Sequence, residues 1–584
     1  MKKLSVIDSA FLMLESRETP MHVGGFNLFT LPEGADEQEF LHGLAAGMRT
    51  ADALQPPFGD KLKVGRLGML GPLYWEPDTA LDLDYHIRHS ALPKPGRFRE
   101  LFALVSRLHG TLLDRNRPLW ETHLIEGLPD RQFAVYSKFH HAAIDGVRSI
   151  HLQQSMYSAD PKERIHHSPL SMTARNRYLE SLHINRPTEA QQRNVAEMLK
   201  ASFDSSGHML GAVRKYAGAW QGKGGSLVVP WLNVPKSSIN TRVDGARRFV
   251  AQSWPFERIR AVGKAMDGTF NDAVLAMCAG ALRTFLLNHG ELPTQSLKSM
   301  VPVSLRRAGD MDSSNAVGAI SADLATNIKD PVQRFRAIKA SMEAGKAMFQ
   351  DMSPEEASLF LQLIQLPGLL LIPLGLGSRF PPYSTVISNV PGPRQPMYWN
   401  GARLEGIYPA SIVTEGIALN ITLVTYDKQV DFGIMACRRS LPQVQRFIDY
   451  LEDSLVELEE AAGIRSVKTP QPAKASTGAS KVATRPKAKA KASAKAKTTA
   501  KTQQPAPARP KAKVKAKAKT KAKTKAKTKA KTKAKTKAKT KAEAKAGAKK
   551  LKVRAIPRLK AEAGAKVVPK SPALPGGILR RLPA

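Results

Sequence analysis

The stretch QFAVYSKFHHAAIDG, residues 132–146, contains the signals that decide the fold. Its first part, Gln132–Phe139, is rich in aromatic and β-branched residues and predicts a β-strand. The turn-like HHAAIDG follows, and Val147–Tyr157 then has the composition of a helix. The alternation of strands and helices resumes at Phe249, so we predict an α/β protein.

Further predicted elements divide the first 465 residues into two α/β lobes. Phe270–Asn288 is apolar on more than one face, which predicts a buried helix. The other predicted elements are strands at Ser299–Leu305 and Thr385–Val390, a hairpin of Ile417–Thr425 and Val430–Met435 around Tyr426–Gln429, and a closing amphipathic helix at Leu441–Ala462. We place one lobe at 1–160, a polar linker or mobile excursion with Pro and Gly at 161–245, and the second lobe at 246–465.

The charge of the chain is concentrated in its C-terminal tail, residues 466–584. Of the 89 basic and 50 acidic residues, 38 and 2 lie there, so the tail carries +36 and residues 1–465 carry +3. Lysine occupies every odd position from Lys511 to Lys541, and the tail has no aromatic residue. Such a segment cannot bury enough apolar surface to order itself, so we predict disorder. Its charge predicts binding to DNA, RNA or an anionic lipid surface, and the alternative is a solubilising repeat expansion.

Cysteines and the N-terminus indicate the compartment. Cys278 and Cys437 lie far apart, which excludes a disulfide scaffold and a cysteine-based zinc module and fits a reducing environment. Asp8 and Glu15 interrupt the apolar residues of the N-terminus, so we see no signal peptide and expect a cytoplasmic protein.

One apolar segment, Leu359–Leu376, approaches the length of a membrane span. It contains two glutamines and two prolines, which argue against a stable transmembrane helix. Three roles are compatible with this segment: contact with a lipid interface or the wall of a lipid tunnel, ordinary core packing, and a membrane span.

The tandem histidine His140-His141 is the sharpest candidate for chemistry. At a strand end, consecutive side chains point in opposite directions, so one imidazole can face a cleft. A histidine with a pKa near neutrality suits proton abstraction from a hydroxyl. Asp145 could orient the loop through an arginine or cap the next helix, and Gly146 permits close backbone approach. A metal site at His141 and Asp145, or two plain core histidines with a capping aspartate, are the alternatives.

HHxxxDG is the motif of the CoA-dependent acyltransferase superfamily, and other segments resemble one branch of it, the bacterial wax ester synthase/diacylglycerol acyltransferase family. The resemblance covers about residues 4–460. Its other segments are Ile7–Phe11, Pro20–Gly24, Pro118–Glu121 (PLWE), Asn271–Ala276 (NDAVLA), Met300–Arg306 (MVPVSLR) and Ser388–Pro393 (SNVPGP). It implies two chloramphenicol-acetyltransferase-like lobes that form a pseudo-dimer with a tunnel between them.

The resemblance also implies residue roles. His141 would be the general base that deprotonates a long-chain alcohol or the free hydroxyl of a diacylglycerol, which then attacks the acyl-CoA thioester directly. His140 would be a positional partner and Asp145 a structural one. We nominate Asn271 as the donor to the oxyanion, with helix capping by Asn271, aided by the charge of Asp272, as the alternative.

Further residues are predicted to shape the substrate channel. Pro118-Leu119-Trp120 would line it or pack in the core, and Ser388-Asn389 would shape a tunnel or form a simple turn. The sequence singles out no residues for the CoA phosphates.

For partners, we expect acyl-CoA as co-substrate, no other cofactor and no metal, and peripheral contact with a membrane or lipid inclusion. The alternatives are a related acyltransferase with another alcohol or amine acceptor, and a non-enzymatic protein that tethers lipid droplets or the nucleoid.

Overall fold

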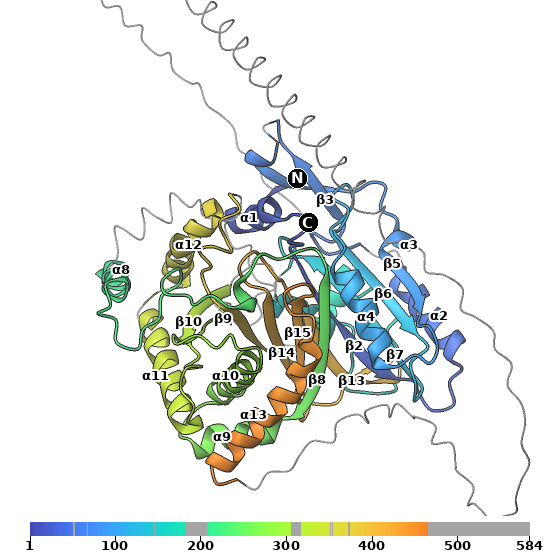
Figure 1. The fold of residues 1–584 in the computed structure, drawn as a ribbon. Coiled ribbons are helices and arrows are strands. Elements are labelled where there is room, and N and C mark those ends of the chain that lie inside the picture. The colour runs from blue at the N-terminus through green and yellow to red at the C-terminus, as the bar shows by residue number, and fades with distance from the viewer. Residues whose placement is uncertain are drawn as a thin grey trace, which may run out of the picture. The chain divides into compact units, whose positions relative to one another are not determined.

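The computed structural model of the chain describes most of its first 464 residues (Figure 1). Asp145 and the tail predicted to be disordered lie outside the described residues. The described ranges are 1–50, 53–66, 68–144, 146–181, 207–304, 317–350, 352, 354–371 and 374–464.

The tandem histidine lies at the end of a strand in a six-stranded sheet, called here the first sheet. Its order is β12-β13-β2-β7-β6-β5, with all neighbours antiparallel except the parallel β5 and β6. The strands are β12 (Tyr398–Trp399), β13 (Ala402–Ala410), β2 (His22–Thr30), β7 (Gln132–His140), β6 (Trp120–Glu126) and β5 (Ile87–Ala91).

The second sheet also has six strands, in the order β10-β9-β11-β14-β15-β8. The strand β11 runs parallel to both neighbours, and the other pairs are antiparallel. The strands are β10 (Val317–Asp323), β9 (Lys298–Ser304), β11 (Thr385–Pro391), β14 (Leu419–Tyr426), β15 (Gln429–Cys437) and β8 (Arg247–Pro255).

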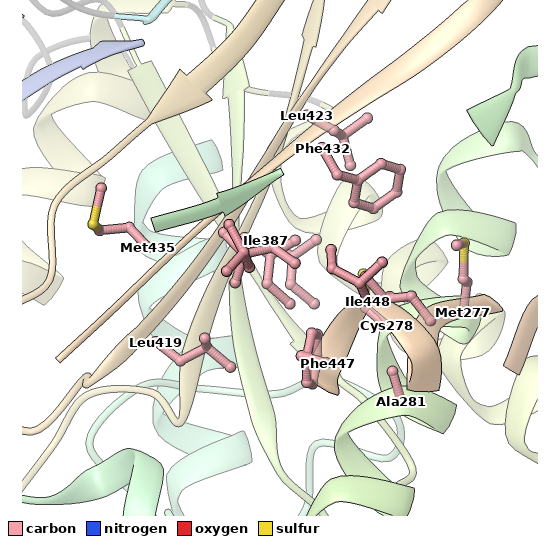
Figure 2. Close-up of a cluster of buried hydrophobic side chains, with 14 of the residues drawn as sticks. Met277, Cys278, Ala281, Ile387, Leu419, Leu423, Phe432, Met435, Phe447 and Ile448 are labelled. Atoms are coloured by element: carbon pink, nitrogen blue, oxygen red, sulfur yellow. The ribbon is translucent and has the colours of Figure 1, made fainter. Parts of the chain in front are cut away.

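Four helices cover the second sheet (Figure 1) and enclose the largest apolar core. They are α9 (Phe256–Ala265), α10 (Phe270–Asn288), α11 (Pro331–Phe349) and α13 (Phe447–Ala461). Figure 2 shows part of this core, in which Cys278 of α10 and Phe447 of α13 share one cluster with Ile387 and Phe432 of the sheet. In the described residues, α10 is the one helix long and apolar enough to cross a membrane, and 72% of its apolar window is buried inside the protein, as expected of a core helix.

A small third sheet and the remaining helices complete the fold. The third sheet has the order β1-β4-β3, and the helix α1 (Val6–Leu14) follows its first strand. Its strands are β1 (Lys2–Lys3), β4 (Leu73–Pro77) and β3 (Asp60–Val64). The other helices are α2 (Glu37–Met48), α3 (Leu83–His86), α4 (Phe98–His109), α5 (Gly146–Gln154), α6 (Met172–Ser181), α8 (Gly207–Trp220), α12 (Pro354–Leu371), and the 3₁₀ turns η1 (Gly68–Leu70), η2 (Ser238–Asn240) and η3 (Val444–Arg446).

The α/β class predicted from the sequence is confirmed, and most predicted elements appear within a few residues of their expected bounds. The helix Phe270–Asn288 has the predicted limits, and Tyr426 pairs with Gln429 at the predicted hairpin. The closing helix differs, because a 3₁₀ turn precedes it and α13 begins only at Phe447.

The two large sheets do not follow the order of the chain. β13 comes from the C-terminal part of the sequence, yet it pairs with β2 at the edge of the first sheet, from Arg403 opposite Thr30 to Ala410 opposite Gly24. It also packs against β14 and β15 of the second sheet. One strand therefore joins the two sheets, a connection that no local sequence signal announced.

Candidate active site

The tandem histidine occupies the junction between β7 and the turn that leads to α5. His140 is the last residue of β7, fully buried and paired with His22 of β2. His141 is half-buried, and its N–H donates to the carbonyl of Met21 over 2.9 Å. Gly146 is the first residue of α5. The two imidazoles thus have different exposures, as the alternation of side chains along a strand requires.

His140 is held in one orientation by the turn that follows it. Its Nδ1 accepts the N–H of Ala142 over 3.1 Å, so the proton of a neutral ring sits on Nε2. Nε2 lies 3.5 Å from Oε1 of Glu15, a carboxylate whose side chain is almost fully buried. This buried, hydrogen-bonded environment suits a structural role for His140, which holds the loop in place, better than contact with substrate.

Glu15 is stabilised as a carboxylate by several donors. Its oxygens accept the N–H of Met21 over 3.1 Å and the guanidinium of Arg115 over 2.9 and 3.2 Å. Burial by itself raises the pKa of Glu15, but His140, Met21 and Arg115 together outweigh it and lower the pKa. A charged Glu15 therefore stands behind the loop at neutral pH.

The ring of His141 stacks on Phe11 of α1. The two centroids lie 4.2 Å apart and the planes differ by 8°. The neighbouring Ala142 and Ala143 belong to an apolar cluster with Leu12 and Leu119. The side of the loop toward α1 is thus closely packed.

A second set of buried polar groups supports β2 and β7 from behind. His22 Nε2 lies 2.6 Å from the carbonyl of His109, and the His109 Nδ1 lies 3.0 Å from the hydroxyl of Tyr136. Burial, followed by the nearby charge of Lys138, lowers the pKa of His109 to about 3. The pKa of His22 lies well below its usual value, first because of burial and then because of His109 and Lys138. These two histidines are neutral structural groups.

Lys138 closes the end of α4. Its ammonium is fully buried and donates to the carbonyls of Leu108 over 3.0 Å and Thr111 over 2.7 Å, where a helix C-terminus favours positive charge. Glu121 lies 3.5 Å away as counter-ion. Sequence reasoning missed this network; its one local sign was a lysine inside a largely apolar strand.

The Pro118-Leu119-Trp120 segment lies directly beside the tandem histidine. The carbonyl of Leu119 accepts the N–H of His140 over 2.9 Å. The Trp120 ring is buried, donates from Nε1 to the carbonyl of Phe58 over 2.8 Å, and stacks on His86.

Trp120 also lines a cavity on the face of the first sheet opposite His140. The cavity is narrow, with a volume of about 30 Å³, and part of it opens to solvent. The lining residues are Asn27, Met48, Ile87, Trp120, Thr122, Val135, Ser137, Phe139, Leu152, Met156, Ser168, Pro169 and Leu170. The lining is mostly apolar, which suits hydrocarbon better than a charged ligand.

The segment around Ser388-Asn389 belongs to β11, where both residues are half-buried and pair with Thr422 and Leu423 of β14. The strand β11 packs against α5, and Val390 shares an apolar cluster with Ile144 of the HHAAIDG loop. Ser388 and Asn389, which were predicted to shape the tunnel, therefore belong to a strand that lies near the HHAAIDG loop.

Asn271 and Asp272 lie in the first turn of α10, which packs against α9, α11 and α13. The residue that caps this helix is Thr269, whose hydroxyl accepts the N–H of Asp272 over 3.2 Å. Oδ2 of Asp272 in turn accepts the N–H of Thr269 over 2.8 Å. The idea that Asn271 itself caps the helix is therefore wrong, because the capping box is formed by Thr269 and Asp272.

Within the described ranges, no three His, Cys, Asp or Glu side chains gather in a way that could hold a metal ion. Asp145, the second ligand of the metal alternative, lies outside those ranges.

A half-buried histidine on the turn after a central strand, with its tandem neighbour locked inside, has the placement that a general base needs. Comparison with known proteins shows which family the chain belongs to. Residues 4–274 match the model of the wax ester synthase/diacylglycerol acyltransferase catalytic domain, and residues 313–459 match the C-terminal domain of the same family. The chain belongs to the wax ester synthase/diacylglycerol acyltransferase family, and it is an O-acyltransferase of that type.

Individual relatives agree over nearly their whole length. A probable diacylglycerol O-acyltransferase of Mycobacterium tuberculosis is 44% identical over 464 residues, 78% of this chain and 98% of the relative. The O-acyltransferase WSD of Acinetobacter baylyi is 38% identical over 456 residues, 78% of this chain and 96% of the relative. The solved wax ester synthase/diacylglycerol acyltransferase of Marinobacter aquaeolei is 39% identical, with a TM-score of 0.62, over 80% of this chain and 100% of that one.

Proposed function

We propose that this enzyme transfers the acyl group of a long-chain acyl-CoA to the hydroxyl of a long-chain alcohol or a diacylglycerol, with His141 as general base. The observation that carries the proposal is the half-buried His141 on the loop after β7, inside the segment that matches the family's catalytic domain. Because its ring is only partly buried, a hydroxyl can reach His141, whereas the fully buried His140 offers no such access.

The reaction proceeds without a covalent enzyme intermediate. The imidazole of His141 takes the proton of the acceptor hydroxyl, and the oxygen attacks the thioester carbonyl carbon. The carbon–sulfur bond of the tetrahedral intermediate then breaks, and the CoA thiolate takes the proton back from the imidazolium. Both cysteines are buried, so neither offers its sulfur to a substrate, and burial also raises the pKa of the Cys278 thiol. Asn271 stays the residue predicted to stabilise the oxyanion.

The substrates would meet between the two large sheets. We propose that the lobes built on these sheets form a pseudo-dimer with a tunnel that ends at His141. The contact of α5 with β11 and the apolar cavity beside Trp120 support this path.

Peripheral contact with a lipid surface is the second part of the proposal. Apolar side chains are exposed on α1, on α12, which packs against α1, and in the segment that follows α12. They are Val6, Met13, Leu363, Leu374 and Phe380. Such side chains would insert at an apolar boundary from which lipid acceptors come. The basic tail would add attraction to a polyanion, either DNA or anionic lipid.

The decisive experiment is an acceptor panel with the purified full chain. Palmitoyl-CoA with hexadecanol or dioleoylglycerol should yield lipid ester, and His141→Ala should lower the rate by at least about 100-fold, as expected for loss of a general base. His42→Ala, on the exposed side of α2, is the matched control and should keep the parent rate. Equal ester formation by the His141 variant would exclude the catalytic assignment. Turnover with short alcohols or amines alone would assign the other acceptor class.

A further inference from the structure

The N-terminal helix α1 contacts the tandem histidine at two points. Phe11 lies in α1, and Glu15 is the residue that caps the C-terminal end of this helix. The two are four residues apart, so they lie on the same side of the helix, one above the other. The first stacks on the ring of His141, and the second faces the ring of His140. The motif Ile7–Phe11 thus contributes a contact to the tandem histidine, although the proposed reaction gives this motif no role.

The end of α1 is fixed in place by Arg115. Its guanidinium binds Glu15 and also donates to the carbonyl of Leu12 over 2.8 Å. A cation at this position satisfies a carbonyl that the helix itself leaves unpaired and complements the helix dipole. Leu12 is buried in the cluster that includes Ala142 and Ala143 of the loop. Phe11 is therefore presented on a rigid element.

Glu15 also fixes the backbone of His141 through one intermediate residue. Its carboxylate accepts the N–H of Met21, and the carbonyl of Met21 accepts the N–H of His141. The backbone of the histidine is thus tied to α1 from one side while its ring rests on Phe11 from the other. Two independent contacts of this kind leave the imidazole little freedom to change its plane.

We propose that Phe11 is a positioning residue for His141, and that α1 holds the histidine in its reactive orientation through Phe11 and Glu15. The parallel stack does two things. It fixes the ring plane, and the face of the phenyl ring attracts the positive charge that the imidazole gains when it takes the acceptor proton. The benefit is larger for the imidazolium than for the neutral ring, so the contact lowers the barrier more than it strengthens substrate binding. This proposal rests on His141 being the base.

The test is a comparison of kcat and KM for acyl transfer from palmitoyl-CoA to hexadecanol by the full chain. Phe11→Leu removes the aromatic face, and we expect kcat to fall about 3- to 30-fold with KM nearly unchanged, the range that a cation–π contact supports. Phe11→Tyr keeps the face and should retain most of kcat. Arg17→Ala changes an exposed side chain just beyond the same helix and should change neither constant.

A double mutant separates this role from a merely structural one. In the His141→Ala background, Phe11→Leu should cause no further loss, because Phe11 acts through the imidazole. If Phe11→Leu folds poorly, Phe11→Met keeps a similar volume without the ring and serves the same comparison. A loss in KM alone, an equal loss in both backgrounds, or an unchanged kcat would overturn the proposal. Full activity of His141→Ala itself would instead overturn the proposed function, so the two failures are distinguishable.

Discussion

Replacing Asp431 with asparagine should stabilise the protein, and the gain should grow with pH. Asp431 lies on β15 and is fully buried. Its Oδ1 accepts the hydroxyl of Ser253 on β8 over 2.6 Å, and its Oδ2 accepts the N–H of Ile407 on β13 over 2.8 Å. The carboxyl therefore connects the second sheet to the strand that crosses into the first.

Burial is the main cause that raises the pKa of Asp431 from 3.8 to about 7, and its hydrogen bonds reduce this shift only in part. Between these two values the unfolded chain releases a proton that the folded chain keeps, so stability falls as pH rises through this window. At 1.36 kcal/mol per pKa unit, the cost is about 2 kcal/mol near pH 5.5 and about 4 kcal/mol near pH 8.5. Asparagine carries no such cost, and its amide can donate to the Ser253 oxygen while its carbonyl still accepts the Ile407 N–H.

The measurement is urea unfolding of the parent and of Asp431→Asn at both pH values, with tryptophan fluorescence as the signal that monitors unfolding. We expect the variant's advantage in unfolding free energy to be about 2 kcal/mol larger near pH 8.5 than near pH 5.5. Asp427→Asn, in the turn of the same hairpin and half-buried, is the control and should follow the pH dependence of the parent. An advantage of equal size at both pH values would show that Asp431 is not a buried neutral acid, and the reasoning would fail.

Three further predictions concern the remaining parts of the chain. Asp272→Ala removes the capping box, so it should lower the unfolding free energy by about 1 kcal/mol in urea titrations. Asn271→Ala should instead lower kcat and leave the unfolding free energy unchanged. The reverse pattern would exclude Asn271 as oxyanion donor. Deletion of 466–584 should leave turnover of a dissolved substrate nearly unchanged while it weakens salt-sensitive binding to DNA or anionic vesicles in co-sedimentation; salt-insensitive binding that survives the deletion would refute a tethering tail. Leu374→Glu and Phe380→Glu should reduce flotation with neutral lipid emulsions, and unchanged flotation would move the lipid contact to another face.

Local sequence patterns are sufficient to predict the elements and to single out the HHAAIDG loop. The strand that ends at His140, the helix Phe270–Asn288 and the Tyr426–Gln429 turn depend on contacts within a few residues, and each lies near its predicted bounds. The HHAAIDG motif is likewise continuous in sequence, so the order of its residues alone is enough to nominate His141. Charge counting alone also separates the near-neutral enzyme from its basic tail.

Tertiary structure decided which residues stand around that loop. Phe11 meets His141 across about 130 positions of sequence, and Arg115 reaches Glu15 across 100, so no local period could reveal either contact. The capping residue of α10 proved to be Thr269, since only the backbone path shows where the helix begins. The crossing of β13 into the first sheet follows from pairing between segments almost 400 residues apart. Sequence by itself therefore determined the elements and the nomination of His141, because these depend on neighbours along the chain. The residues that contact this histidine were decided only when folding brought distant segments together.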